Sequence, residues 1–497
     1  MGKVYLVGAG PGDIKLITIR CLELIRRADV IIYDNLVNKE LLEFARAGAE
    51  VIYAGKKASC HELPQRQINS LLAEKGAGNN IVVRLKGGDP FIFGRGGEEA
   101  QHLAKKGIPF EIVPGITSAI SVPAYAGIPL THRDHASTVA FITGHEDEKK
   151  EVSSINWHEL AHGPDTLVFL MGMKNLPKIV QRLIDEGKSP DTPACVISSG
   201  TLAAQKVATA TLSTLPDKVR AMKIAPPGII VVGDVIKLRD ELNWFERKPL
   251  FGKKIVVTRS RHQSHRFGEL LLDRGAEPVY LPTIDIEPIV PNKRLRTAID
   301  KISSYDAIIF TSVNGASIFF AHMRGSGKDA RALSGITVIA IGSATSAQLA
   351  IYGINADLVP QTYTSEGIVS ILEDLGVADK HFLLPRAEEA RDIIIKYIRN
   401  NGGTCTVIPV YRAEVPASIE SPPADIDVIT FTSSSTADNF MMLYGKDVLK
   451  GRIVASIGPI TTETLLKAGI KVDIEAERSD IPGLVRAMEE YFEDREA

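Results

Sequence analysis

The chemistry-bearing side chains of the first half concentrate in residues 84–99, RLKGGDPFIFGRGGEE. This stretch follows an apolar run and combines five glycines with two arginines, a lysine and an aspartate. Glycine lets a backbone approach a ligand closely, and guanidinium groups pair bidentately with carboxylates. The combination indicates a site for a carboxylated or nucleoside ligand.

Two shorter glycine-containing segments also follow apolar runs. Residues 8–13, GAGPGD, resemble a dinucleotide-binding turn, but Asp13 stands where the last glycine of GxGxxG belongs. A tight turn without a ligand explains this segment equally well. Residues 113–119, VPGITSA, form a third candidate. The chain contains no GxxxxGK[ST] phosphate-binding loop.

The elements that must position these loops are short strands alternating with amphipathic helices, which is the pattern of an α/β fold. Helices are expected at 18–27 and 65–74. Strands are expected at 4–7, 30–33, 51–53, 81–85, 111–113, 138–143, 167–170, 194–197 and 229–232.

The second half contains an internal repeat. Residues 306–312, DAIIFTS, are echoed by 427–433, DVITFTS, and AIGSAT at 340–345 is echoed by SIGPIT at 456–461. Such a long period predicts duplicated domains rather than a solenoid. We expect repeat units at about 253–375 and 380–497, forming two α/β lobes with a cleft between them.

Two proline-bounded segments, 281–288 and 407–415, look extended. We expect them to be the strands that cross between the two lobes.

Composition narrows the class of protein. The 497 residues have a formal net charge of -2 and 24% charged residues, which gives no chain-wide basic surface for nucleic acid. The four cysteines form no CxxC pair, so neither a disulfide framework nor a structural metal site is expected. The start of the chain lacks signal-peptide features, and no apolar run reaches the ~20 residues of a membrane span. We expect a cytoplasmic protein without membrane or nucleic-acid partners.

The motifs of the first half together resemble the uroporphyrinogen-III C-methyltransferase family over about residues 2–242. They are GAGPGD, RLKGGDPFIFGRG, VPGITSA, YAGIPLTHR at 125–133 and TGH at 143–145. The resemblance implies a tetrapyrrole-methyltransferase fold of two α/β subdomains. It also implies two methyl transfers from S-adenosylmethionine to C2 and C7 of uroporphyrinogen III, giving precorrin-2, and a homodimer formed through this half.

By matching motif positions, the resemblance makes Asp34 the proton acceptor and Lys56 the proton donor. Without it, Asp34 reads as a helix cap and Lys56 as a solvated surface lysine. Arg84 and Arg95 are expected to bind substrate carboxylates; the alternative for both is ion pairing with Glu98 or Glu99.

Nine residues match the family's contacts to S-adenosylmethionine. Chemistry alone leaves Met171 open as core filler and Gly200 as an ordinary turn. The nine are Pro11, Gly87, Gly88, Asp89, Ile92, Thr117, Ser118, Met171 and Gly200. Asn35 departs from the arginine that often follows the catalytic aspartate in the family.

The second half resembles uroporphyrinogen-III synthase over about residues 253–497, in the order of its short motifs and in its duplicated layout. The resemblance implies a bilobal α/β fold and cyclisation of hydroxymethylbilane with inversion of ring D, without a cofactor. Tyr411 is the candidate for assisting departure of the hydroxyl. Substrate-binding candidates are Ser312, Asn314, Thr345, Ser433, Ser434 and Thr461. Each hydroxyl reads equally well as a helix N-cap.

The expected organisation is a methyltransferase at 1–242, a linker at 243–252 and a synthase at 253–497. One alternative is a methyltransferase of a related corrin precursor. Another is that the second half is a non-catalytic ligand-binding module, because fold does not decide function. A nicotinamide oxidoreductase fails on the glycine spacing.

Overall fold

The computed structural model describes residues 2–55, 64–145, 154–416 and 421–496. The chain divides into two compact units. The first is Met1–Lys254 with Leu270–Glu277 and Glu489–Ala497; the second is Ile255–Glu269 with Pro278–Met488. Within the described ranges, no helix combines the length and apolar character that a membrane-spanning segment needs.

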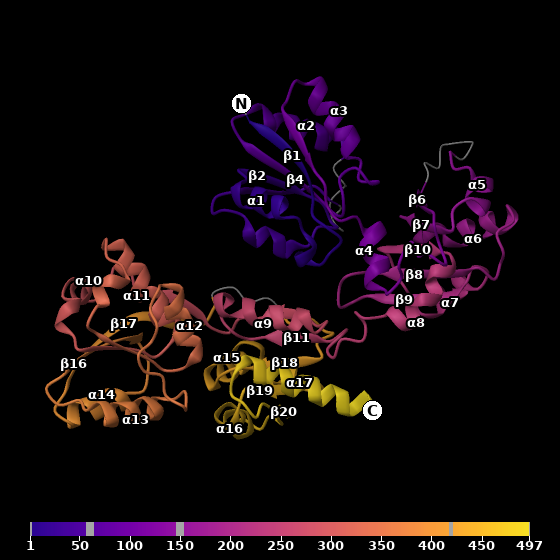
Figure 1. The fold of residues 1–497 in the computed structure, drawn as a ribbon. Helices are drawn as coiled ribbons and strands as arrows, with labels where there is room; N and C mark the ends of the chain where they lie inside the picture. The colour runs from indigo at the N-terminus through magenta and orange to yellow at the C-terminus, as the bar shows by residue number, and fades with distance from the viewer. Residues whose placement is uncertain (1, 56–63, 146–153, 417–420, 497) are drawn as a thin grey trace. The chain divides into compact units, whose positions relative to one another are not determined.

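The first unit begins with a five-stranded parallel sheet in the order β3-β2-β4-β1-β5 (Figure 1). Strands rich in Val and Ile form it because both faces are covered. Helices α2 and α3 lie on one face and α1 on the other. The elements are β1 (Lys3–Gly8), α1 (Ile19–Arg27), β2 (Val30–Tyr33), a 3₁₀ helix (Lys39–Phe44), β3 (Glu50–Tyr53), α2 (Gln65–Ala77), β4 (Ile81–Lys86), α3 (Gly96–Lys105) and β5 (Phe110–Val113).

A second sheet of the first unit is mixed, in the order β6-β7-β10-β8-β9. The nine strands predicted for the first half are all present. Edge strand β9 is not predicted, because its KVATAT sequence lacks a long apolar run. The elements are α4 (Ser118–Tyr125), β6 (Val139–Thr143), α5 (Trp157–His162), β7 (Thr166–Leu170), α6 (Leu176–Asp185), β8 (Pro193–Ser198), β9 (Lys206–Thr211), α7 (Leu215–Ala221), β10 (Gly228–Val232) and α8 (Arg239–Leu242).

The predicted linker is packed within the first unit rather than extended. The ring of Trp244 lies 5.0 Å from that of Tyr125, and its Nε1 donates to the carbonyl of Ala124 at 3.1 Å. Glu246 accepts from Gln205 at 2.8 Å and pairs with Arg239 at 2.5 Å. The residues after 242 therefore complete the packing of α4. The domain boundaries drawn from the sequence stay a prediction.

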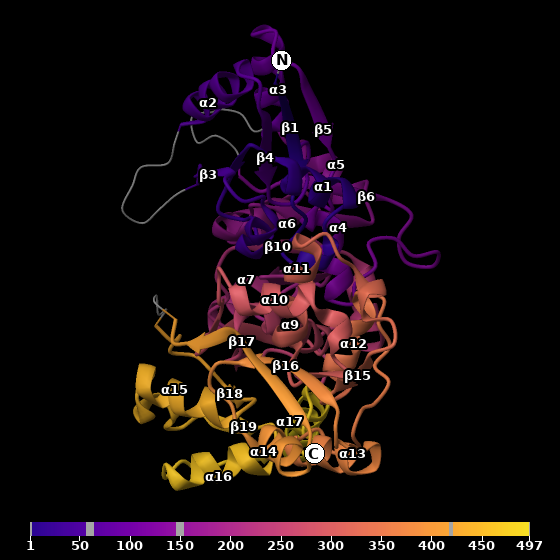
Figure 2. The same cartoon turned by 90° about the vertical axis from the view of Figure 1, so that its left-hand side faces the viewer.

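The second unit holds two sheets, ordered β12-β11-β18-β19-β20 and β13-β17-β16-β14-β15. Helices α15 and α16 lie beside β18 and β19 (Figure 2). Helices α10 and α11 cover one face of the other sheet, and α13 and α14 cover its opposite face. The prediction of an α/β fold is confirmed in both units.

The elements of this part are β11 (Lys254–Val257), α9 (Arg261–Asp273), β12 (Glu277–Tyr280), β13 (Asp285–Pro288), α10 (Lys293–Asp300), β14 (Ala307–Phe310), α11 (Val313–Gly325), β15 (Thr337–Ala340), α12 (Ser343–Ile351), α13 (Ser365–Leu375), β16 (His381–Ala387), α14 (Ile393–Asn400), β17 (Thr404–Glu414), β18 (Val428–Phe431), α15 (Ser434–Tyr444), β19 (Ile453–Ser456), α16 (Pro459–Lys467), β20 (Ile474–Glu475) and α17 (Ile481–Glu496).

Neither repeat unit of the sequence folds into one lobe by itself. The first sequence repeat, about 253–375, contributes β11 and β12 to one sheet and β13, β14 and β15 to the other. The second gives β16 and β17 to one sheet and β18, β19 and β20 to the other. Strands β11 and β18 pair in parallel although they lie far apart in the chain: Ile255 pairs with Val428, 173 positions later. The duplication thus yields two interleaved lobes.

Candidate functional site

Three glycine-containing loops meet at the carboxyl ends of β1, β4 and β5. The backbone N–H of Gly88 donates to the carbonyl of Gly10 at 2.7 Å, and Gly10 donates back at 3.3 Å. A Cβ at Gly115 would lie 2.3 Å from the carbonyl oxygen of Gly88 and 2.7 Å from the Cα of Gly8. Only glycine permits this approach. Open parallel sheets bind ligands at this edge.

Asp89 connects two of these loops. Its Oδ1 accepts from the backbone N–H groups of Phe91 at 2.7 Å and Ile92 at 3.2 Å. Its Oδ2 accepts from the N–H of Gly115 at 3.0 Å. Asp89 therefore shapes the loop that follows β4, and its expected contact with S-adenosylmethionine stays a prediction.

The other predicted cofactor residues lie on neighbouring loops of the first unit. Pro11 and Gly87 belong to the loops after β1 and β4. Thr117 caps α4 by accepting from the N–H of Ala119 at 3.3 Å, and Ser118 is the first residue of that helix. Met171 follows β7 and is 52% exposed, so its reading as core filler is wrong.

The loop after β8 is held against α4 and against the loop after β1. A Cβ at Gly200 would lie 2.4 Å from Val122 of α4. The N–H of Asp13 donates to Oγ1 of Thr201 at 3.2 Å, and the hydroxyl of Tyr125 donates to Asp13 at 2.9 Å. Burial raises the pKa of Tyr125, which keeps this hydroxyl a donor. Loops of both sheets of the first unit are thereby joined.

Backbone strain gathers in the same loops. Non-glycine residues rarely adopt positive φ, and such residues cluster at ligand sites because the surrounding structure must hold them there. Five of the seven described non-glycine residues with positive φ lie in these loops: Phe93 (53°), Arg95 (58°), Met171 (57°), Ser199 (50°) and Thr201 (71°).

Asp34 follows β2 at the same edge of the first sheet. Its Oδ2 lies 3.3 Å from Nη2 of Arg84, and its Oδ1 is buried without a hydrogen-bond partner among the described residues. The helix-cap reading of Asp34 is wrong, because the 3₁₀ helix that follows is capped by Asn38. Lys56, the predicted proton donor, lies outside the described residues.

Arg84 lies in the interior rather than on the surface, with 2% of its area exposed. Its Nε lies 3.3 Å from Glu99, and its Nη1 lies 3.4 Å from the carbonyl oxygens of Ile32 and Leu85. All three guanidinium nitrogens thus contact protein acceptors. The predicted ion pair with Glu99 is present, and direct binding of a substrate carboxylate stays a prediction.

Arg95 is exposed and forms a bidentate pair with Glu98. Its Nε and Nη2 both lie 2.9 Å from the carboxylate oxygens of Glu98. The hydrogen bond from Arg95 lowers the pKa of the Glu98 carboxyl. An exposed guanidinium at the site loops is able to exchange this partner for a ligand carboxylate, which leaves the predicted role of Arg95 open.

Two charged residues near Arg84 received no site role from the sequence: Lys86 was not singled out, and Glu99 was given only as an alternative ion-pair partner of Arg84 and Arg95. Lys86, 4% exposed, and Glu99, fully buried, pair at 3.1 Å. The signal was present: Arg84 and Lys86 stand at alternate positions of an otherwise apolar strand, so both point to one face. Charged residues are rarely buried unless they are paired.

In the second unit, Tyr411 of β17 lies beside two of the predicted binding residues. Its hydroxyl donates to Oγ of Ser312 at 3.1 Å and also hydrogen-bonds the side chain of Asn314. Burial raises the pKa of Tyr411, so its hydroxyl stays protonated at neutral pH. The structure therefore brings together Tyr411, Ser312 and Asn314.

The remaining hydroxyls serve local structure as well. Ser312 and Ser433 are helix N-caps, of α11 and α15, as the alternative reading expects. Ser434 accepts from Oγ1 of Thr464 at 2.7 Å. Thr345 and Thr461 are buried near the starts of α12 and α16. Their contacts with a substrate stay predictions.

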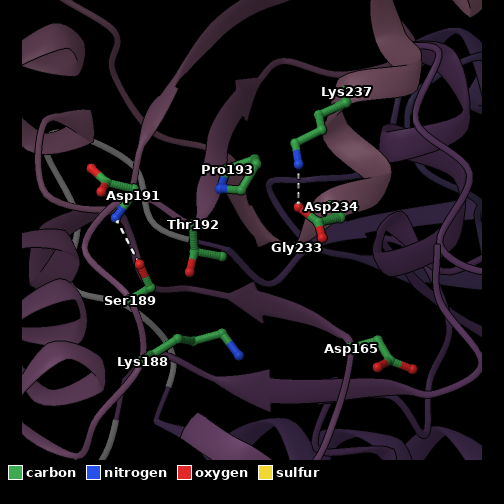
Figure 3. A pocket seen from close by; sticks show the side chains of 9 residues that line it. All are labelled: Asp165, Lys188, Ser189, Asp191, Thr192, Pro193, Gly233, Asp234 and Lys237. Carbon is green, nitrogen blue, oxygen red and sulfur yellow. Dashed lines mark hydrogen bonds and ion pairs between the residues drawn. The ribbon is translucent and has the colours of Figure 1, made fainter.

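A hollow of about 350 Å³ opens at the other edge of the second sheet, where β7 and β8 begin (Figure 3). Met171 and Gly200 lie where these strands end, so the hollow includes no predicted site residue. Its lining is Asp165, Lys188, Ser189, Asp191, Thr192, Pro193, Gly233, Asp234 and Lys237. No group of three or more His, Cys, Asp or Glu side chains able to hold a metal is present in the described part of the chain.

Comparisons with known proteins match the two halves of the chain to two different families. Residues 3–216 match the family of tetrapyrrole (corrin/porphyrin) methylases, and residues 265–486 match uroporphyrinogen-III synthase HemD. The uroporphyrinogen-III C-methyltransferase of Priestia megaterium is 53% identical over 236 residues, which cover 48% of this chain and 99% of that protein.

A crystal structure of uroporphyrin-III C-methyl transferase from Thermus thermophilus complexed with S-adenyl homocysteine is 35% identical in sequence. It matches 48% of this chain and 100% of that chain, with a TM-score of 0.42.

One relative spans both halves. The porphyrin biosynthesis protein HemD of Ruminiclostridium josui is 40% identical over 493 residues, 97% of each chain. The chain therefore belongs to the family of this porphyrin biosynthesis protein HemD, with a tetrapyrrole methylase module followed by a uroporphyrinogen-III synthase module.

Proposed function

We propose that the second half closes hydroxymethylbilane to uroporphyrinogen III with inversion of ring D, and that the first half methylates this product at C2 and C7 to give precorrin-2. The observation that carries the methyltransferase proposal is Asp34: one carboxylate oxygen is held by Arg84 and the other is buried without a described partner. The product of one half is the substrate of the other, which gives the fusion a chemical reason.

The residues around the three glycine loops fit S-adenosylmethionine. The close contacts of Gly8, Gly88 and Gly115 bring the three loops together at the sheet edge, where open parallel sheets bind nucleotide ligands. Pro11, Gly87, Gly88, Asp89, Ile92, Thr117, Ser118, Met171 and Gly200 would hold it. When bound, it supplies an electrophilic methyl group on a sulfonium.

The side chains of the protein then align the substrate with the methyl group and remove a proton from the macrocycle. A pyrrole carbon of the substrate must lie in line with the methyl group, and holding that geometry supplies much of the acceleration. Asp34 accepts the proton that the macrocycle loses as its double bonds rearrange. Arg95 binds a substrate carboxylate by exchanging Glu98. Lys56 donates a proton to the macrocycle and takes one back as the double bonds rearrange, so the one proton released for each methyl group is the one that Asp34 accepts. We also propose that this half forms a homodimer.

In the synthase half, the chain orients a flexible linear substrate so that the inverted ring closes. The hydroxyl of hydroxymethylbilane leaves as water after receiving a proton, and a carbon–carbon bond closes the macrocycle. Tyr411 turns its O–H from Ser312 to the departing hydroxyl of the substrate and donates a hydrogen bond to it. No cofactor is proposed for this half.

Hydroxymethylbilane and S-adenosylmethionine, supplied together to the purified chain without oxygen, test both proposals. We expect a type III macrocycle with two added methyl groups, identified by mass and absorbance. A type III macrocycle without methyls would overturn the methyltransferase proposal. A type I macrocycle, which forms by spontaneous closure, would overturn the synthase proposal and favour a non-catalytic ligand-binding module.

Replacing Tyr411 by phenylalanine is expected to lower kcat for cyclisation about 2- to 10-fold, the worth of one hydrogen bond. Tyr305 offers a matched control: it is 8% exposed, against 7% for Tyr411, and its ring centroid lies 4.5 Å from that of His381, with the two rings tilted by 44°. Type III product formed per second would be measured for both variants. Equal rates for Tyr411→Phe and Tyr305→Phe would remove Tyr411 from the reaction.

A further inference from the structure

The first sheet buries two cations on one face of its central strand β4. Arg84 and Lys86 are two residues apart, and only 2% and 4% of their areas are exposed. Isolated charges in such places are strongly disfavoured, so buried cations need opposite charges beside them. Among the described residues, the carboxylates that form ion pairs with these two cations are Asp34 of the loop after β2 and Glu99 of α3.

One oxygen of Glu99 gathers three donors from two elements. Its Oε1 lies 3.3 Å from Nε of Arg84, 3.1 Å from Nζ of Lys86 and 3.2 Å from Nε2 of Gln65, which is on α2. Its Oε2 is buried without a partner among the described residues. Glu99 does not contact Asp34, but the same guanidinium joins them: Nε faces Glu99 and Nη2 faces Asp34.

The charges of the cluster balance formally. Burial lowers the pKa of Lys86, and the neighbouring charge of Arg84 lowers it further, whereas Glu99 and Asp34 act in the opposite direction. Removing either Glu99 or Lys86 therefore leaves one uncompensated charge near Asp34. Because Arg84, Lys86 and Glu99 are buried, this imbalance is screened less than a surface charge would be.

We propose that Glu99 and Lys86 are positioning residues for methyl transfer. Glu99 holds the Arg84 guanidinium so that Nη2 rests against one oxygen of Asp34 and leaves the other oxygen for the substrate proton. Lys86 balances the charge of Glu99, so that the pair leaves no net charge beside the base. This inference rests on the proposed function of Asp34 as proton acceptor.

Two substitutions of opposite charge give a test that a merely structural role would not satisfy. In Glu99→Gln, the two cations favour ionised Asp34, so the rising limb of the kcat–pH profile for methylation moves to lower pH. In Lys86→Met, the remaining negative charge disfavours ionised Asp34, so the limb moves to higher pH. We expect shifts of about 0.5–1 pH unit in opposite directions.

Among the residues that the structure describes, the charged groups that face Asp34 are Arg84 by contact and Lys86 by charge, both on β4. Behind them stand Glu99 on α3 and the uncharged Gln65 on α2, while Tyr53 of β3 donates to the neighbouring Asn35 at 3.2 Å.

Besides the limb shift, kcat in Glu99→Gln should fall about 10-fold, because the guanidinium is no longer fixed. The KM for S-adenosylmethionine should change less than about 2-fold, since no residue of the cluster is among the predicted cofactor contacts.

Glu99→Asp keeps the charge and should return the limb to its wild-type position. Glu74→Gln on α2 and Lys105→Met on α3 are exposed charge-matched controls and should not move it. The pH at the midpoint of the rising limb does not depend on how much of the enzyme is folded. A partly unfolded variant therefore still gives a usable midpoint. Active sites are counted by S-adenosylhomocysteine binding in a calorimeter.

Failures of the two proposals are distinguishable. A wild-type chain that does not methylate uroporphyrinogen III would overturn the proposed function itself. A wild-type chain that methylates, with limbs that stay fixed or move in the same direction in Glu99→Gln and Lys86→Met, would overturn the positioning role alone. Opposite shifts with rescue by Glu99→Asp would establish it.

Discussion

Replacing Asp34 by asparagine is expected to lower the rate of methyl transfer about 10²- to 10⁴-fold, the usual contribution of a positioned general base. The amide keeps the size of the carboxylate but cannot accept the substrate proton. Oδ1, which is buried without a partner among the described residues, is the expected proton acceptor, because Oδ2 already faces Arg84. Single-turnover formation of methylated product, started with uroporphyrinogen III and S-adenosylmethionine, measures the loss.

The same chain supplies the controls for Asp34→Asn. Affinity for S-adenosylhomocysteine should stay within about 3-fold, because the glycine loops are untouched. Cyclisation of hydroxymethylbilane by the second half should be unchanged. The exposed Asp134→Asn should behave as wild type. Methylation by Asp34→Asn at near the wild-type rate would mean that another group takes the proton.

Local pattern was enough to place the glycine loops and the strands that carry them, whereas the role expected for Asp34 came from the family resemblance. Apolar runs of four to six residues bounded by glycine or charge became strands, because a parallel sheet covered on both faces needs little else. The loops were found because glycine is required where backbones touch, as between Gly88 and Gly115.

Tertiary pairing was less visible from the sequence. Glu98 and Glu99 were named only as the alternative partners of Arg84 and Arg95, at the surface, and only the fold turns Glu99 inward to Arg84 and Glu98 outward to Arg95. Both outcomes follow from helix geometry, since adjacent residues of α3 point about 100° apart. The convergence of Lys86 on the same carboxylate needed strand alternation and helix placement together.

The duplication stays a prediction, and the segments expected to cross between the lobes, 281–288 and 407–415, lie next to the points where the chain changes sheet. Each repeat crosses from one sheet to the other partway along its length, after β12 in the first repeat and after β17 in the second. Sequence similarity shows which segments correspond, whereas strand pairing depends on contacts between residues far apart in the chain. For that reason periodicity alone cannot say whether two repeats form separate or interleaved sheets.

Replacing Gly115 by alanine is expected to weaken binding of S-adenosylhomocysteine about 10- to 100-fold, the range that overpacking a fixed backbone costs. The new Cβ would lie 2.3 Å from the carbonyl oxygen of Gly88 and 2.7 Å from the Cα of Gly8. Both contacts are with backbone, so no side chain is able to turn aside. The loops after β1 and β4 must therefore separate, and the N–H of Gly115 must leave Asp89.

Gly97 provides the matched control for this experiment. It lies near the start of α3, and a Cβ there would meet nothing within 4 Å. Gly97→Ala should bind S-adenosylhomocysteine within about 2-fold of wild type, since alanine is the better helix former. Calorimetry on both variants, with cyclisation by the second half as a check on folding, separates a local effect from a general one. Equal affinities for Gly115→Ala and Gly97→Ala would show that the nucleoside does not depend on the contact of the three loops, and the predicted cofactor residues on them would lose their common structural basis.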